Sequence, residues 1–241
     1  MKRVLITCRS DPAEGQWWEI YRLASATFQE YAARHGYDYR DFFYENLDPK
    51  QIQTRWPGLI YGRTPEWPFK PGRTSPCWLK IPIIEMMLEE YDEVLYLDND
   101  CVILDMSKDI ASEVPPLKWL AMAECTSGEG TGPNVGVAYT RSTPMARKFW
   151  RECWTADYWK TARWTDQGQV FGLLGYNHNP PISKLRPSEY DSGYCPLSAE
   201  WNDWTEAGKA HPWTRIYHAA WGPPAAGNKL AWMQKALFGS V

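Results

Sequence analysis

Two aspartates end a short apolar run in the middle of the chain. Residues 94–97 are Val-Leu-Tyr-Leu, a run typical of a strand buried on both faces, and Asp98 and Asp100 follow with Asn99 between them. Two carboxylates at the end of a buried strand are costly unless a cation meets them. A divalent metal ion relieves their repulsion while collecting oxygen ligands. The pattern indicates a site for a metal ion and a diphosphate; the alternative is a solvated acidic turn.

Three further side chains could complete such a site. His218 ends a second apolar run, Ile216-Tyr217-His218. Neutral imidazole suits Mn²⁺ beside carboxylates, so His218 is a candidate third ligand, although a lone histidine in such a run also suits the core or a turn. Lys80 and Lys229 are candidate counter-charges for a diphosphate, although most lysines are simply solvated.

Two polar segments could contact a sugar. Asn134 follows a glycine-rich loop, residues 127–133, that lacks a GxGxxG or P-loop pattern. We expect a lid beside a binding site, with the Asn134 amide near a sugar hydroxyl or satisfying a turn. Asp166 and Gln167 begin an expected helix and could touch the reacting sugar, whereas Asp166 could instead serve as an N-cap.

The elements that position these residues alternate between strand and helix. We expect strands at residues 4–8, 37–44, 94–97, 119–124 and 135–139, and helices at residues 17–31, 78–90, 144–154 and 166–174. The start signal of the first helix is Asp11-Pro12 and its stop signal is Gly36, while Pro82 is expected in the first turn of the second helix. Thr7 lies at the carboxyl end of the first strand, where ligands of open α/β sheets gather. Residues 48–76 have no clear period and suggest a long functional loop.

This alternation predicts one α/β domain over residues 1–241, with a mostly parallel central sheet flanked by helices. A net charge of −3 argues against nucleic acid as the main partner. The 15 Trp and 14 Tyr suggest a carbohydrate ligand, although a Trp-rich core explains many such rings. Trp154, Trp159 and Trp164 could form an acceptor platform or pack two helices together.

The cysteines and the apolar segments bear on the compartment. The six Cys include no CxxC pair, and no run suits a signal peptide or a bilayer span. We therefore expect reduced thiols and a cytoplasmic, soluble protein. Peripheral membrane contact or packing on the core are the alternatives for the apolar residues near the C-terminus: Leu230, Trp232, Met233, Leu237 and Phe238.

Taken in order, several segments resemble the GT-A glycosyltransferases. The likeness is greatest to the galactosyl/xylosyltransferase group related to yeast mannan and galactomannan enzymes, with glycogenin-like enzymes more distant. Their order and spacing carry the resemblance over most of the chain, from Val4 to about Lys229. The matching segments are Tyr31-Ala32, His35-Gly36-Tyr37, Trp78-Leu79-Lys80, residues 91–104, Asn134-Val135-Gly136, Asp166-Gln167, Trp201-Asn202 and Tyr217-His218.

The resemblance implies a Rossmann-like GT-A domain that moves a sugar from a nucleotide-sugar donor, by default a UDP-sugar, to a carbohydrate acceptor with retention. It makes Asp98 and Asp100 the DxD motif and assigns Mn²⁺ or Mg²⁺ to Asp98, Asp100 and His218. It places Asp166 and Gln167 at the reacting sugar. Donor binding falls to Thr7, Lys80, Asp98, Asn99, Asn134 and Lys229. The segment from Trp221 to Lys229 departs from the family's spacing, and the family's eukaryotic membrane anchor is missing, which favours a bacterial or viral enzyme.

Two other classes fit parts of the sequence. Residues 95–102 also match the motif of haloacid-dehalogenase-like phosphatases, in which Asp98 would be the nucleophile. Those enzymes usually begin with that strand and need a later acidic pair, which we do not find. A non-catalytic carbohydrate-binding protein would explain the tryptophans but would not need a buried acidic pair.

Overall fold

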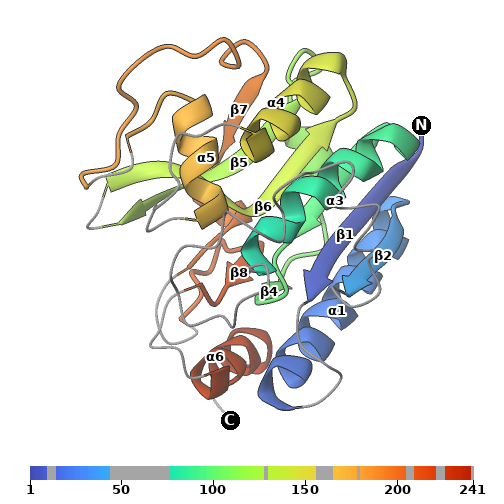
Figure 1. Cartoon of the computed structure of the whole chain (residues 1–241). Coiled ribbons are helices and arrows are strands. Elements are labelled where there is room, and N and C mark those ends of the chain that lie inside the picture. The colour runs from blue at the N-terminus through green and yellow to red at the C-terminus, as the bar shows by residue number, and fades with distance from the viewer. Residues whose placement is uncertain are drawn as a thin grey trace.

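A six-stranded sheet forms the centre of the protein (Figure 1). The computed structural model describes residues 1–9, 15–43, 76–127, 130–155, 165–177, 180–204, 209–220 and 226–239. The strand order is β2-β1-β3-β6-β5-β7. These strands are β1 (Arg3–Arg9), β2 (Asp38–Phe43), β3 (Glu93–Leu97), β5 (Leu120–Ser127), β6 (Gly130–Arg141) and β7 (Tyr194–Leu197).

The sheet is mostly parallel, as predicted. β1 pairs in parallel with both β2 and β3, and β5 pairs in parallel with β7. β6 is antiparallel to its two neighbours, β3 and β5. Among the described strands of this sheet, β6 alone therefore runs in the opposite direction.

Alternate residues of the central strands β1 and β3 belong to two separate hydrophobic cores. Val4 and Ile6 of β1 face one core and Leu5 faces the other, and β3 divides in the same way. This is the side-chain alternation of an extended strand, and it requires an apolar layer on each side of the sheet. All five residues of β3 are buried, as its sequence predicts.

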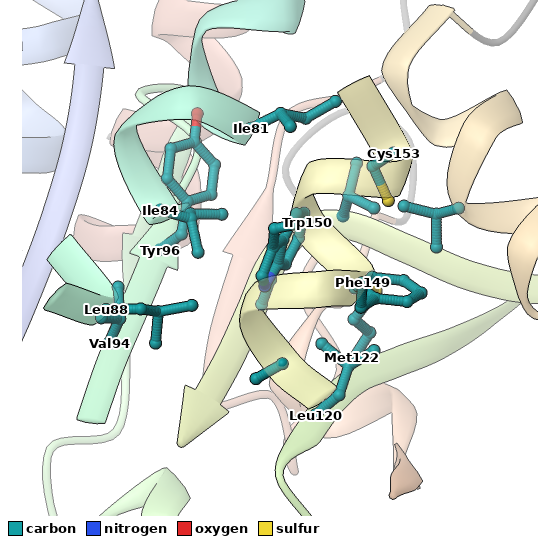
Figure 2. Close-up of a cluster of buried hydrophobic side chains, with 14 of the residues drawn as sticks. Ile81, Ile84, Leu88, Val94, Tyr96, Leu120, Met122, Phe149, Trp150 and Cys153 are labelled. Atoms are coloured by element: carbon teal, nitrogen blue, oxygen red, sulfur yellow. The ribbon is translucent and has the colours of Figure 1, made fainter. Parts of the chain in front are cut away.

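Helices α3 (Pro76–Glu90), α4 (Pro144–Thr155) and α5 (Thr165–Leu173) cover the first face. Figure 2 shows how α3 and α4 pack against β3 and β5 in this layer. The side chains that meet there include Ile81, Ile84 and Leu88 of α3, Val94 and Tyr96 of β3, Leu120 and Met122 of β5, and Phe149, Trp150 and Cys153 of α4.

The opposite face is covered by α1 (Gly15–His35), α6 (Ala226–Phe238) and a small second sheet. That sheet pairs β4 (Cys101–Ile103) with β8 (Ile216–His218) in antiparallel fashion. Two short 3₁₀ helices, η2 (Ile110–Glu113) and η3 (Ala199–Trp201), complete the layer. α1 and α6 lie side by side at the lower end of Figure 1.

Three expectations about these elements were wrong. Pro82 lies in the interior of α3 rather than in its first turn, because the helix begins earlier, at Pro76. The lost N–H bond is tolerated where the neighbouring Ile81 and Ile83 are buried in the core. Strand β7 joins the sheet after Gly175, in a segment where no strand was expected. Residues 130–133, expected in a glycine-rich loop, instead pair with β5 as the start of β6. Trp154 is 2 % exposed and packs edge-on against Trp78, which is the packing alternative for this residue.

Other expectations have plainer outcomes. Gly36 follows α1 with a φ of 72°, the left-handed conformation that ends many helices. Met233 is buried, and Leu230, Trp232 and Leu237 pack on the core, which is the packing alternative for these four residues, whereas Phe238 is exposed. No described helix is long and apolar enough to cross a membrane. Asp11-Pro12, Trp159, Trp164, Trp221 and nearly all of residues 48–76 lie outside the described residues.

Candidate functional site

The site lies where β3 ends at the carboxyl edge of the sheet. The backbone N–H of Asp98 donates to Gly136 O at 2.8 Å, which continues the pairing of β3 with β6 by one residue. The N–H of Cys101 then donates to Asp98 O at 3.0 Å, closing a tight turn over Asp98, Asn99 and Asp100. Both carboxylates are therefore fixed within one turn, as the spacing of the two residues predicts.

The small second sheet brings His218 to these carboxylates across 118 residues of sequence. Cys101 of β4 is paired with His218 of β8, and Ala219 N donates to Asp100 O at 2.9 Å. His218 Nε2 consequently lies 3.1 Å from Asp100 Oδ1 and 3.9 Å from Asp98 Oδ2. The three predicted metal ligands are thus neighbours in the structure.

Asn202 sets the orientation of the His218 ring. Asn202 is completely buried, and its Oδ1 lies 2.9 Å from His218 Nδ1. An amide oxygen can only accept, so Nδ1 carries a hydrogen, and Nε2 is the nitrogen that faces the carboxylates. Holding the far nitrogen of a histidine in this way is how proteins prepare imidazole ligands.

Gly136 leaves room for this arrangement. The register of β5 and β6 shifts beside it, between Met122 and Ala123. A Cβ atom at Gly136 would lie 2.4 Å from His218 Cε1 and 2.9 Å from Asp98 Oδ2. Any other residue would therefore push the imidazole or the carboxylate away.

Lys80 joins the turn to helix α5. Its Nζ lies 2.8 Å from Asp98 Oδ1 and 3.2 Å from Asp166 Oδ2, and its side chain is almost completely buried. Tyr96 also donates its hydroxyl to Asp98 Oδ1, at 2.7 Å. One buried ammonium thus serves two carboxylates, and Asp166 faces this cation from the first turn of α5.

Lys229 binds the other aspartate of the turn. Its Nζ lies 2.5 Å from Asp100 Oδ2. Burial alone would raise the pKa of Asp100, but Lys229 and His218 hold it well below its ordinary value. Burial likewise opposes the charged form of Lys229, but Asp100 raises the pKa of the ammonium above its ordinary value. The pair is therefore fully ionised near neutral pH.

The donor atoms fit a hard divalent cation such as Mn²⁺ or Mg²⁺. The possible ligand atoms of Asp100, Cys101 and His218 lie within 4.8 Å of one another. Two ligands bound about 2.1 Å from one ion at right angles lie about 3 Å apart, close to the observed spacing of His218 Nε2 and Asp100 Oδ1. Burial raises the pKa of the Cys101 thiol, which points to Gly136 O, so Cys101 contributes no thiolate. The site therefore offers carboxylate and imidazole ligands, without a thiolate, to a divalent ion.

The other residues predicted to contact the donor or the sugar are Asn134, Thr7, Asn99 and Gln167. Asn134 Oδ1 accepts from Gly136 N at 2.8 Å, so this oxygen satisfies the local backbone. The Thr7 side chain is completely buried, and its hydroxyl has no partner among the described residues. Asn99 and Gln167 are partly exposed, one in the turn and the other beside Asp166. Donor or sugar contacts by these residues stay predictions.

Sequence reasoning gave no role to four residues that build the site: Tyr96, Cys101, Gly136 and Asn202. A glycine inside an apolar strand pattern often marks a close approach of two groups, so Gly136 carried a usable signal. Asn202 belongs to one of the segments that carry the family resemblance, but its partner, a histidine 16 residues away, is brought near only by the fold.

Comparison with known proteins supplies structural neighbours only. No protein family profile matches the chain, and no curated protein matches its sequence. Among solved structures, a glycosyltransferase involved in the glycosylation of the major capsid of PBCV-1 is similar, with a TM-score of 0.60, 18% identity, and coverage of 96% of this chain and 98% of that one. Mouse xyloside xylosyltransferase 1 gives a TM-score of 0.55 at 10% identity, covering 90% and 97% of the two chains.

A bacterial glycosyltransferase is also similar in structure. The glycosyltransferase GlyE of Streptococcus pneumoniae gives a TM-score of 0.53 at 14% identity, covering 97% of this chain and 60% of that one. Identities this low establish architecture rather than activity. The chain has the GT-A fold of these glycosyltransferases.

Proposed function

We propose that this chain is a metal-dependent glycosyltransferase, which moves a sugar from a nucleotide-sugar donor, a UDP-sugar, to a carbohydrate acceptor with retention of configuration. The observation that carries the proposal is the placement of Asp98, Asp100 and His218 at the carboxyl end of β3, in a fold shared with glycosyltransferases. Ligands of open α/β sheets gather at such an edge.

Asp98, Asp100 and His218 would hold Mn²⁺ or Mg²⁺ in this reading. The bound ion would supply Lewis-acid stabilisation for the charge that develops on the departing diphosphate. Gly136 supports the assignment, since the two side chains that flank it approach too closely for a Cβ between them. Lys80 supports it too, because its buried ammonium lies within ion-pair distance of both Asp98 and Asp166.

Asp166 and Gln167 would act on the sugar. A glycosyl transition state resembles an oxocarbenium ion, and a carboxylate or amide oxygen nearby stabilises its positive charge. Gln167 is partly exposed and adjoins Asp166, whose carboxylate is tied to the turn through Lys80. The Gln167 amide would face the anomeric carbon, while Asp166, held by Lys80, would lie beside the reacting sugar. Thr7, Asn99, Asn134 and Lys229 would contact the donor.

A thermal-shift panel tests the donor site without knowledge of the acceptor. It compares UDP, GDP, ADP and CMP, each with Mn²⁺ and with EDTA. A ligand at about 100 times its dissociation constant adds about 2.7 kcal/mol, which raises the melting temperature of a domain this size by roughly 5–10 °C. We expect this shift for UDP with Mn²⁺ and none with EDTA.

Variants at two of the predicted metal ligands test whether UDP binds at this site. His218→Ala and Asp100→Ala are expected to abolish the UDP shift. Asp92→Asn is the matched control, because Asp92 is an exposed carboxylate just before the other end of β3, where it accepts from Lys2 N. A UDP shift that survives in EDTA, or no shift with any nucleotide, contradicts the proposal.

A further inference from the structure

Lys229 holds an oxygen of the aspartate that is the best-placed metal ligand. Its ammonium is 2.5 Å from Asp100 Oδ2, while Asp100 Oδ1 faces His218 Nε2 at 3.1 Å. A metal ion held by Asp100 Oδ1 and His218 Nε2 would therefore share one carboxylate with the Lys229 ammonium.

Two cations this close repel each other strongly in a buried site. Asp100 is 9 % exposed, so water screens the repulsion poorly. Without a bound diphosphate, Lys229 therefore weakens the binding of a metal ion, either because it occupies Asp100 Oδ2 or because it is positively charged. Lys80 does not act in this way on Asp100, because its ammonium is bound to Asp98 and Asp166.

A bound diphosphate would replace the repulsion between Lys229 and the metal ion by a net attraction of both to the diphosphate. It brings negative charge that can bind an ammonium and a metal ion together. The Lys229 backbone is well anchored, since Met233 buries α6 against the core and α6 packs on α1. The Lys229 ammonium also lies over the ring of Trp17, with 5.7 Å between Nζ and the ring centroid. The response thus needs only a side-chain movement and no displacement of the helix.

We propose that Lys229 couples metal binding to nucleoside-diphosphate binding, an inference that rests on the proposed function. Paired with Asp100, it weakens the binding of a metal ion alone; transferred to the diphosphate, it strengthens the ternary complex. The enzyme would then take up metal and donor together rather than hold the metal permanently. Removal of the Lys229 charge would therefore change two affinities in opposite directions.

The test measures Mn²⁺ binding by the EPR signal of free Mn²⁺, with and without UDP, in the wild type and in Lys229→Met. We expect Lys229→Met to bind Mn²⁺ alone about tenfold more tightly and to bind UDP at saturating Mn²⁺ about tenfold more weakly, a loss of coupling within the usual allosteric range. Lys229→Gln repeats the measurement with a neutral side chain that can still donate a hydrogen bond to Asp100.

Controls separate charge from helix damage. Lys229→Arg keeps the charge and is expected to keep most of the coupling. Lys235→Met removes a lysine from the last turn of the same helix and is expected to change neither affinity. A neutral variant that binds Mn²⁺ alone more weakly, or that leaves the coupling unchanged, overturns the inference while the proposed function stands. A wild-type protein that binds neither Mn²⁺ nor UDP overturns the proposed function and the inference with it.

Discussion

Gly136 controls how closely Asp98 and His218 approach each other. Its missing side chain is what allows an imidazole and a carboxylate to flank one strand position. The types and spacing of Asp98, Asp100 and His218 are visible in the sequence, and so is the glycine. What the sequence does not reveal is which groups crowd it, because this depends on the pairing of β4 with β8 and on the turn after β3.

Gly136→Ala is expected to impair the site more than the fold. The new methyl group would force His218 or Asp98 to move, which costs about 1–3 kcal/mol of stability and separates the metal ligands. We expect Mn²⁺ affinity, measured by EPR, to fall at least about tenfold, as for the loss of an orienting partner.

Gly36→Ala is the matched control for this substitution. Gly36 has a φ of 72° and nothing within 4 Å of the position that a Cβ would take. Alanine there costs about 1 kcal/mol of backbone strain without touching the site. Equal losses of Mn²⁺ affinity in both variants would show that destabilisation, rather than the crowding of His218 and Asp98, causes the effect.

At the scale of elements, helix α3 supplies the cation that joins β3 to α5. The helix was predicted from the period of its apolar residues, and so was the buried strand that follows it. The interior position of Pro82 was not, since the helix extends upstream of the proline and tertiary packing outweighs the lost hydrogen bond. The contact of Lys80 with Asp166 was not predicted either, because the two residues are far apart in sequence and only the layer of helices over the sheet brings them together.

A double-mutant cycle tests whether Lys80 acts as a shared cation. Lys80→Met leaves Asp98 and Asp166 without it, and breaking a buried ion pair in this way costs about 3 kcal/mol. Adding Asp166→Asn removes one of the two stranded charges, so the double variant should be about 1–2 kcal/mol more stable than the sum of the single effects. Urea unfolding measures each corner of the cycle.

The surface offers a control for this cycle. Lys148 on α4 also contacts two carboxylates, those of Glu152 and Glu189, but all three side chains are substantially exposed. Lys148→Met should leave the free energy of unfolding nearly unchanged, as is usual for exposed ion pairs. If the destabilisation of the double variant equals the sum of the effects of Lys80→Met and Asp166→Asn, the two residues do not interact energetically, which contradicts the role of Lys80 as a shared cation.

For the whole molecule, the two cores on either side of one sheet explain where many of the described aromatic residues lie. Tyr31, Tyr37 and Tyr139 belong to one core and Tyr96 to the other. The composition suggested sugar-binding rings, but these four side chains are buried in the packing layers. Composition counts the rings without placing them, and placement requires the strand alternation and the helix faces together.

These buried tyrosines predict steep alkaline unfolding. Burial is the largest cause that raises the pKa of each of the four above its ordinary value. An unfolded tyrosine ionises near pH 10, so above that pH the unfolded state binds fewer protons than the folded state and the free energy of unfolding falls as pH rises. Each tyrosine contributes a slope of about 1.4 kcal/mol per pH unit, and this stabilisation is fully present below about pH 10.

We expect the tyrosinate absorbance of these residues to appear in one step with the loss of far-ultraviolet circular dichroism. Tyr139→Phe, which removes one ionisable group from the core, should make the dependence on pH shallower, and tyrosinate absorbance from all tyrosines in a protein that keeps its native dichroism would contradict this account.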